Sequence, residues 1–167
     1  MINVFANIRK EIPAKLLMIG DGPERNPAEK MCRDLGICDD IRFLGKLEAV
    51  EEVLSVADLF LMPSEKESFG LAALEAMACE VPVISSNTGG LPELNIQGVT
   101  GFLSPVGDVE DMTQKALHVL DKDNLPVFKA NALKRAKEFD ITQILPLYED
   151  YYQRIMEKTA SKAVIRP

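Results

Sequence analysis

Residues 58–86, reading DLFLMPSEKESFGLAALEAMACEVPVISS, decide the fold of this chain. After Asp58 comes an apolar run that is too short for a helix and does not alternate, so residues 58–62 are predicted to form a strand buried on both faces. From Phe69 the apolar spacing becomes helical, and a second buried strand is predicted at residues 81–84. The predicted inward side of the helix is Leu71, Leu74, Met77 and Ala78, with Ala72, Ala73 and Ala76 keeping it slim. The stretch therefore predicts a β-α-β unit.

The rest of the chain continues this alternation of strands and helices. Further strands are predicted at residues 15–19, 41–44 and 100–103, and helices at 3–12, 26–35, 48–56, 108–120, 125–139 and 141–158. Pro146 is expected to kink the last helix or to mark its true start. The pattern predicts an α/β fold, a Rossmann-like doubly wound parallel sheet with helices on both faces, followed by C-terminal helices. We expect one domain over residues 1–158 and a flexible tail over 159–167.

Composition excludes several classes of protein. The 167 residues carry a net charge of −7, which disfavours binding to a nucleic-acid backbone. The chain has no apolar run long enough for a membrane span and no signal-peptide pattern, so we expect a cytoplasmic protein. Cys32, Cys38 and Cys79 lack metal-ligand spacing, and His118 lies on a predicted surface helix, so no metal site is expected. The three cysteines are expected to be free thiols, as in a reducing compartment.

Four loops follow predicted strands and therefore share one edge of the predicted sheet. They contain Gly20 and Gly22, then Gly45 and Lys46, then residues 64–68, and finally Gly89 and Gly90. In open α/β sheets, ligands bind at the carboxyl ends of the strands, where backbone N–H groups and helix N-termini hold anions. Taken singly, the loop of Gly20 and Gly22 is better explained as a structural turn. A tight turn explains Gly89 and Gly90 equally well, and a solvated surface lysine explains Lys46 equally well. Their convergence predicts a binding site.

Glu67 and Glu75 stand with seven residues between them in the word ESFGLAALEAMA. This word resembles the signature of retaining, nucleotide-sugar-dependent glycosyltransferases of the GT-B fold. Within that family, SEKESFGL and LEAMAC look most like the N-acetylglucosaminyl L-malate synthases of bacillithiol biosynthesis. A glycosidase needs its two carboxylates about 5 to 9 Å apart across one bond. Eight residues along one helix would separate them by about 12 Å, which favours two contacts on one elongated ligand.

The resemblance implies a role for each matched residue. Glu75 would accept hydrogen bonds from the ribose hydroxyls, and Glu67 would lie nearer the transferred sugar as the catalytic carboxylate. Backbone N–H groups for sugar or phosphate would come from Ser68, Phe69, Gly70 and Leu71, with further donor contacts from Gly20, Gly22, Gly45, Lys46, Gly89 and Gly90. The loop of Gly45 and Lys46 would lie beside the nucleobase. The implied donor is UDP-N-acetylglucosamine and the implied acceptor L-malate, with no metal or other cofactor.

The resemblance covers only the C-terminal, donor-binding half of a GT-B enzyme. Such enzymes carry a second, N-terminal domain that supplies the acceptor site, and a strand and loop whose Arg and Lys hold the donor diphosphate. Without them the main electrostatic stabilisation of the leaving group is lost, so we expect this fragment to bind a nucleotide sugar without turnover. Two alternatives stay open: a non-catalytic nucleotide-binding or regulatory module, and half of a GT-B sugar-nucleotide epimerase.

Glu80 departs from the resemblance, because the family usually has glycine at this position. The preceding helix must end by Cys79, since Pro82 drives the residue before it out of the helical region. Residue 80 is therefore the expected C′ position of that helix. We predict a left-handed backbone conformation there.

Overall fold

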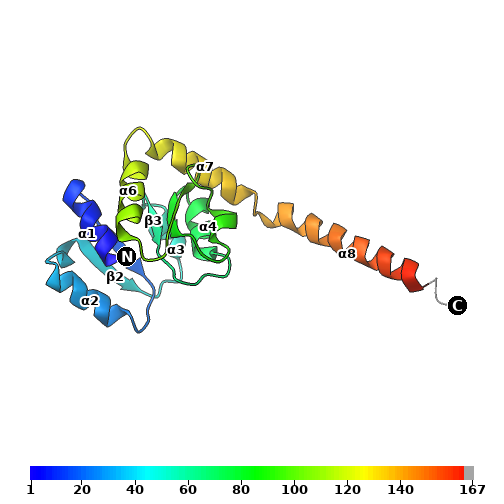
Figure 1. Cartoon of the computed structure of the whole chain (residues 1–167), viewed down its shortest axis with the longest axis horizontal. Helices are drawn as coiled ribbons and strands as arrows, with labels where there is room; N and C mark the ends of the chain where they lie inside the picture. The colour runs from blue at the N-terminus through cyan, green and yellow to red at the C-terminus, as the bar shows by residue number, and fades with distance from the viewer. Residues whose placement is uncertain (164–167) are drawn as a thin grey trace.

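The computed structural model describes residues 1–163 and confirms the predicted order of helices and strands (Figure 1). The elements are α1 (Ile2–Glu11), β1 (Leu16–Ile19), α2 (Arg25–Asp34), the 3-10 helix η1 (Cys38–Asp40), β2 (Ile41–Gly45), α3 (Val50–Leu54), β3 (Phe60–Met62), α4 (Leu71–Ala78), β4 (Val83–Ser86), α5 (Leu91–Leu94), β5 (Gly101–Ser104), α6 (Val109–Leu120), α7 (Leu125–Lys137) and α8 (Ile141–Ala163). No helix within residues 1–163 is both long and apolar enough to cross a bilayer.

The strands form two parallel sheets where the sequence predicted one. β1 pairs with β2, and β4 lies between β3 and β5 in the second sheet. Among the described residues, β1 and β3 do not pair with each other, so the two sheets are separate. β3 is therefore an edge strand, and its Phe60, Leu61 and Met62 are only half-buried, which corrects the prediction of a strand buried on both faces.

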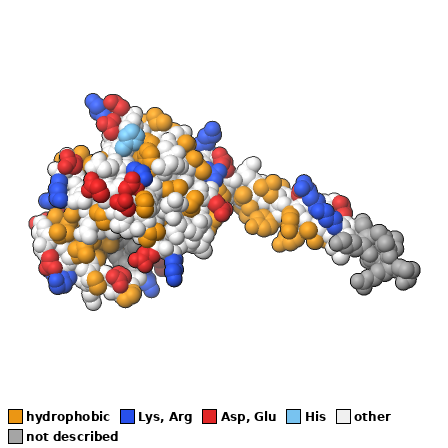
Figure 2. All heavy atoms as spheres, in the orientation of Figure 1, with side chains coloured by type: hydrophobic (Ala, Val, Ile, Leu, Met, Phe, Trp, Pro, Cys, Tyr) orange, Lys and Arg blue, Asp and Glu red, His pale blue; other side chains and the backbone are white. Residues whose placement is uncertain are grey.

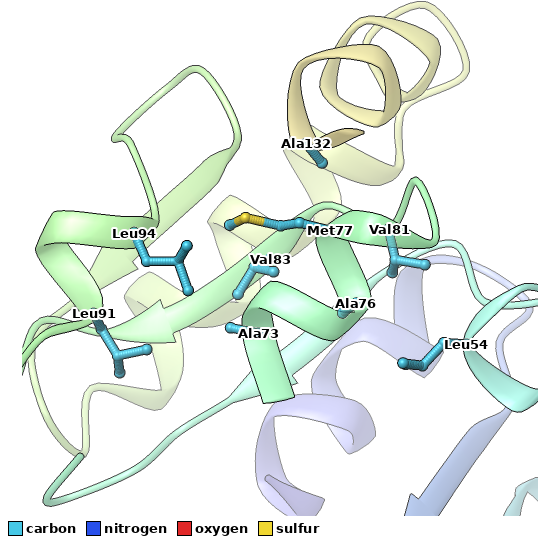
Figure 3. Packing of buried hydrophobic residues seen from close by; sticks show 9 residues of the cluster. All are labelled: Leu54, Ala73, Ala76, Met77, Val81, Val83, Leu91, Leu94 and Ala132. Atoms are coloured by element: carbon cyan, nitrogen blue, oxygen red, sulfur yellow. The ribbon is translucent and has the colours of Figure 1, made fainter. Parts of the chain in front are cut away.

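β4 is the buried centre of the second sheet. All four of its residues are buried, and Val83 and Ile84 point to opposite faces because side chains alternate along a strand. The cluster on the Val83 side joins α3, α4, α5 and α7, and Figure 3 shows it: Leu54, Ala73, Ala76, Met77, Val81, Val83, Leu91, Leu94 and Ala132. The Ile84 side packs against α1 and α6. Helices cover both faces, as predicted.

The inward side of α4 differs from the predicted one. Ala73, Ala76 and Met77 are buried, whereas Leu71 is 66% exposed and Ala78 is also exposed. The reason is visible in Figure 3, where α7 crosses over α4 and Ala132 lies close to Met77, so the small face of α4 turns inward. The helix also begins at Leu71, because Gly70 is its N-cap.

The predicted free state of two cysteines is wrong. Cys32 on α2 and Cys38 at the start of η1 form a disulfide, with Cα atoms 5.1 Å apart. The turn after α2 brings the two residues to the ordinary Cα separation of a disulfide. Cys79 is free. The expectation of a reducing compartment therefore loses the support of Cys32 and Cys38, because these two cysteines are not free thiols.

α8 stands away from the rest of the molecule (Figure 1). It runs through Pro146 without a break and continues to Ala163, past the predicted end at Lys158. Residues 164–167, which belong to the predicted tail, lie outside the described residues. Figure 2 shows hydrophobic side chains gathered along one side of this helix.

Candidate functional site

The loop after β3 and the loop after β4 are pressed together at the backbone. A Cβ atom at Gly89 would overlap the carbonyl group of Glu67, and one at Gly90 would overlap the carbonyl of Ser68. Thr88 adds a hydrogen bond from its Oγ1 to the Glu65 carbonyl, at 3.3 Å. The paired glycines are thus required for close approach, and they fix the position of Glu67.

Glu67 and Glu75 flank the N-terminus of α4. Glu67 is half-buried in the loop, and Glu75 is exposed on the helix. The first N–H groups of an α-helix have no partner within the helix, and no side chain caps α4. The α4 N-terminus therefore offers unpaired backbone donors, with Glu67 before it in the chain and Glu75 on its second turn. This combination suits a ligand that carries both an anionic group and hydroxyl groups.

Two of the residues expected to present backbone groups have other contacts. The N–H of Ser68 donates to Glu67 Oε1 at 3.0 Å, so this carboxylate already holds that donor. Phe69 packs edge-on against Phe139, with ring centroids 5.7 Å apart, so its side chain anchors the loop to the end of α7. The exposed side chain of Leu71 lies at the start of α4 and offers an apolar surface on the side of the helix that carries Glu75.

The loops after β1 and β2 form a second contact. The N–H of Gly20 donates to the Gly45 carbonyl at 2.8 Å, next to a register shift between Met18 and Ile19. Gly20 and Gly22 have open space above them, with no atom within 4 Å of a Cβ placed at either residue. Lys46 is exposed. The backbone of Gly20 and Gly22 is therefore exposed after the carboxyl end of β1, next to the end of β2.

Sequence reasoning missed Arg25, which lies at this second contact. Its Nε donates to Glu29 Oε1 at 2.9 Å, and its guanidinium carbon lies 5.9 Å from the centre of the Phe43 ring. Its Nη1 lies 3.7 Å from a Cβ placed at Gly45. The signal in the sequence was the spacing of Arg25 and Glu29, which places them four apart on one face of a helix.

The sequence also gave no sign of Asn95, a buried residue that connects the loop of Gly89 and Gly90 to the strands beneath it. Its Nδ2 contacts the carbonyls of Val83 and Phe102 and the hydroxyl of Ser85, and its Oδ1 accepts from Thr100 at 2.9 Å. Asn95 follows α5, whose first turn continues directly from Gly90. The network therefore ties the glycine loop and α5 to β4 and β5.

The predicted site residues come together as two pairs of loops, one on each sheet. Residues 65–69 contact 88–90 beside β3 and β4, and Gly20 contacts Gly45 beside β1 and β2. A hollow of about 650 Å³ lies elsewhere, at the turn that precedes β1, and is lined by Arg9, Lys10, Glu11, Ile12, Pro13, Ala14, Lys15 and Asp40. None of the predicted site residues lines it. The hollow therefore does not coincide with the predicted site.

The class of protein follows from a family comparison. The family model described as glycosyl transferases group 1 matches residues 1–138, and the chain belongs to that family. Its fold matches the GT-B glycosyltransferases: sucrose-phosphate synthase from Thermosynechococcus elongatus superposes with a TM-score of 0.80 at 28% identity, covering 94% of this chain and 42% of that one. Anabaena HepE, solved with UDP and glucose, gives 0.76 at 26% identity, covering 96% of this chain and 44% of that one.

Among curated proteins, N-acetyl-alpha-D-glucosaminyl L-malate synthase of Bacillus anthracis is 41% identical over 161 residues, which cover 93% of this chain and 42% of that protein. D-inositol 3-phosphate glycosyltransferase of Mycolicibacterium smegmatis is 32% identical over 162 residues, covering 92% of this chain and 37% of that protein. The chain thus spans less than half the length of these relatives.

Proposed function

We propose that this chain is the nucleotide-sugar-binding domain of a retaining glycosyltransferase that transfers N-acetylglucosamine from UDP-N-acetylglucosamine to L-malate in the intact enzyme. The observation that carries the proposal is the contact of Gly89 and Gly90 with the backbone of Glu67 and Ser68. This contact holds Glu67 in the loop that precedes α4. The 41% identity with the malate-using relative supports the choice of sugar and acceptor.

The roles of the two glutamates come from the family resemblance, and their positions support the assignment. Glu75 lies on α4 with an exposed carboxylate, and we assign it to the ribose hydroxyls. Glu67 lies in the loop held by Gly89, and we assign it to the transferred sugar. Leaving-group stabilisation is not supplied by either residue, since a carboxylate repels a diphosphate. Binding and orientation of the donor are therefore the steps assigned to this chain.

Calorimetric titration of the two glutamate variants tests this division of roles. Glu75→Ala is expected to weaken UDP binding by about 1.5 to 3 kcal/mol, the scale of hydrogen bonds to a charged group. Glu67→Ala is expected to weaken UDP-N-acetylglucosamine more than UDP. Glu52→Ala, an exposed glutamate on α3, is the control and should change neither affinity. Equal losses for both ligands at both positions would contradict the assignment.

The base, sugar and acceptor are tested with a panel of ligands. UDP, GDP and ADP, each with and without an attached sugar, are titrated into the unchanged chain, and the uridine compounds are expected to bind most tightly. The same chain, mixed with UDP-N-acetylglucosamine and labelled L-malate, is expected to form no glycosyl-malate. Labelled product from this chain alone would overturn the assignment of a binding role without turnover.

A further inference from the structure

The backbone of Gly20 and Gly45, joined by the hydrogen bond between them, forms a surface that we call the shelf. The guanidinium group of Arg25 lies next to this shelf. Its Nη1 is the closest atom to a Cβ placed at Gly45, at 3.7 Å. The side chain is fixed from two directions, because Glu29 accepts from Nε at 2.9 Å and the Phe43 ring lies 5.9 Å from the guanidinium carbon. A planar, oriented donor group therefore borders an open stretch of backbone at the carboxyl end of β2.

The remaining donors of Arg25 are unused within residues 1–163. Its Nε is the only guanidinium nitrogen with a hydrogen-bond partner there, which leaves the N–H groups of Nη1 and Nη2 available. The positive charge, by contrast, is already met by the carboxylate of Glu29. What Arg25 offers a ligand is accordingly directional N–H donation and a flat surface, more than net charge.

The other pair of loops and α4 suit the hydroxyl-bearing parts of a nucleotide sugar, the ribose and the transferred sugar, which leaves the shelf for the base. Glu67 and Glu75 supply acceptors for hydroxyl groups and repel phosphates. The carboxylate of Asp21, between Gly20 and Gly22, accepts from the Gly22 N–H at 3.0 Å, and no atom lies within 4 Å of a Cβ placed at either glycine. A flat ring laid there would lie over open backbone and meet the Arg25 fork at its edge.

We propose that Arg25 reads the nucleobase of the bound nucleotide by donating a hydrogen bond to the carbonyl oxygen at position 4 of the ring, and so favours uracil over cytosine. This inference rests on the proposed function and adds a specificity-determining residue to the same site. Uracil and cytosine have nearly the same shape, but uracil carries a carbonyl acceptor at position 4 where cytosine carries an amino donor. An arginine has donors only, so the amino group of cytosine leaves it unpaired.

The test compares UDP, CDP and uridine by calorimetry with the unchanged chain and with Arg25→Met, Arg25→Lys and Arg33→Met. The unchanged chain is expected to prefer UDP to CDP by about 10-fold or more. Arg25→Met is expected to weaken UDP about 10-fold and to change CDP by less than about 2-fold, so the preference nearly disappears. Arg25→Lys keeps the charge without the fork and should restore only part of the preference. Arg33→Met, at the exposed end of the same helix, is the matched control and should behave like the parent.

Each outcome separates this inference from the proposed function. If the parent binds none of the nucleotides, the proposed function and the role of Arg25 fall together. If the parent binds UDP and Arg25→Met keeps the same preference for UDP over CDP, only the role of Arg25 falls. If Arg25→Met weakens UDP but not uridine, Arg25 serves the diphosphate, and base reading is overturned. Thermal melting of every variant establishes that each one is folded.

Discussion

Glu80 is the only residue other than glycine with a positive φ among residues 1–163, at φ 62°, which confirms the conformation predicted for it. The helix before it ends in a Schellman motif: the N–H of Glu80 donates to the Met77 carbonyl at 3.1 Å, and that of Val81 to the Ala76 carbonyl at 2.9 Å. The motif requires a left-handed residue at this position. Glutamate adopts it at a cost that glycine does not have.

Glu80→Gly is therefore expected to raise the free energy of unfolding by roughly 1 kcal/mol, which is about 2 to 4 °C in Tm for a domain of this size. Removal of a negative charge from the negative end of the helix dipole contributes a few tenths of that. Glu80→Ala is the matched control, because it removes the charge and keeps the Cβ atom. If Glu80→Gly raises Tm no more than Glu80→Ala does, backbone strain at residue 80 is absent. Nucleotide affinity should be nearly unchanged in both.

At the scale of elements, ion pairs at Asp40 tie α1 and the start of β1 to the turn before β2. Its carboxylate contacts Lys15 and Arg9, and the side chain is only 14% exposed. The hydrogen bond from Lys15, together with that from Arg9, holds the pKa of Asp40 below its ordinary value of 3.8, while desolvation opposes them. A carboxyl whose pKa is lowered in the folded state stabilises the fold above its unfolded pKa and loses this contribution as pH falls through the folded value.

Asp40→Asn is therefore expected to lower Tm near neutral pH and to reduce the further loss of Tm on acidification from about pH 6 to about pH 3. Asp39→Asn is the control, since Asp39 is the exposed neighbour and takes part only through its backbone carbonyl. The parent and Asp39→Asn should share one pH profile. Asp111 and Asp140 also have lowered pKa values, so Asp40→Asn keeps part of the acid sensitivity. If Asp40→Asn and the parent lose Tm equally over this range, the ion pairs contribute nothing.

The elements were largely predictable because their signals are local. Short apolar runs between glycines and prolines gave the strands, and helical spacing with Pro and Gly at the ends gave the helices. The pairing between elements was not local. Nothing in residues 58–62 indicates that β3 lacks a neighbour on one side, and the inward face of α4 depends on α7, which lies more than forty residues later in the chain. The Cys32–Cys38 disulfide likewise depends on the turn after α2.

The candidate site shows the same division between local and tertiary information. The sequence placed Glu67, Glu75 and the glycines in loops after strands, because each motif is continuous in the chain. It gave no reason why Gly89 and Gly90 must be glycines, since the atoms that exclude a side chain belong to Glu67, Ser68 and Phe69. Asn95 was missed for a similar reason: three of its four partners lie on two strands and the fourth, Thr100, directly precedes β5, and a buried asparagine has no periodic signature.

At the scale of the whole molecule, α8 contrasts with the body that it follows. Within residues 141–159, its large apolar side chains are each 43% or more exposed, apart from the half-buried Ile144: Ile141, Leu145, Leu147, Tyr148, Tyr151, Tyr152, Ile155 and Met156. A helix that buries so little contributes little to the free energy of unfolding, because most helical stability in proteins comes from packing. The same exposed side chains form an apolar stripe in water, which promotes association between molecules.

Removal of the chain from Ile141 onward is therefore expected to leave Tm within about 2 °C of the parent, because little apolar surface is lost from the core. The shortened chain should also associate less as its concentration rises, measured by sedimentation. Phe128→Ala, which empties a buried position on α7, serves as the sensitive control and should cost about 3 to 5 kcal/mol. A large fall in Tm on shortening, comparable to that of Phe128→Ala, would mean that α8 packs onto the body in solution. Amide exchange distinguishes the two cases, since an unpacked α8 exchanges far faster than the buried turns of α6.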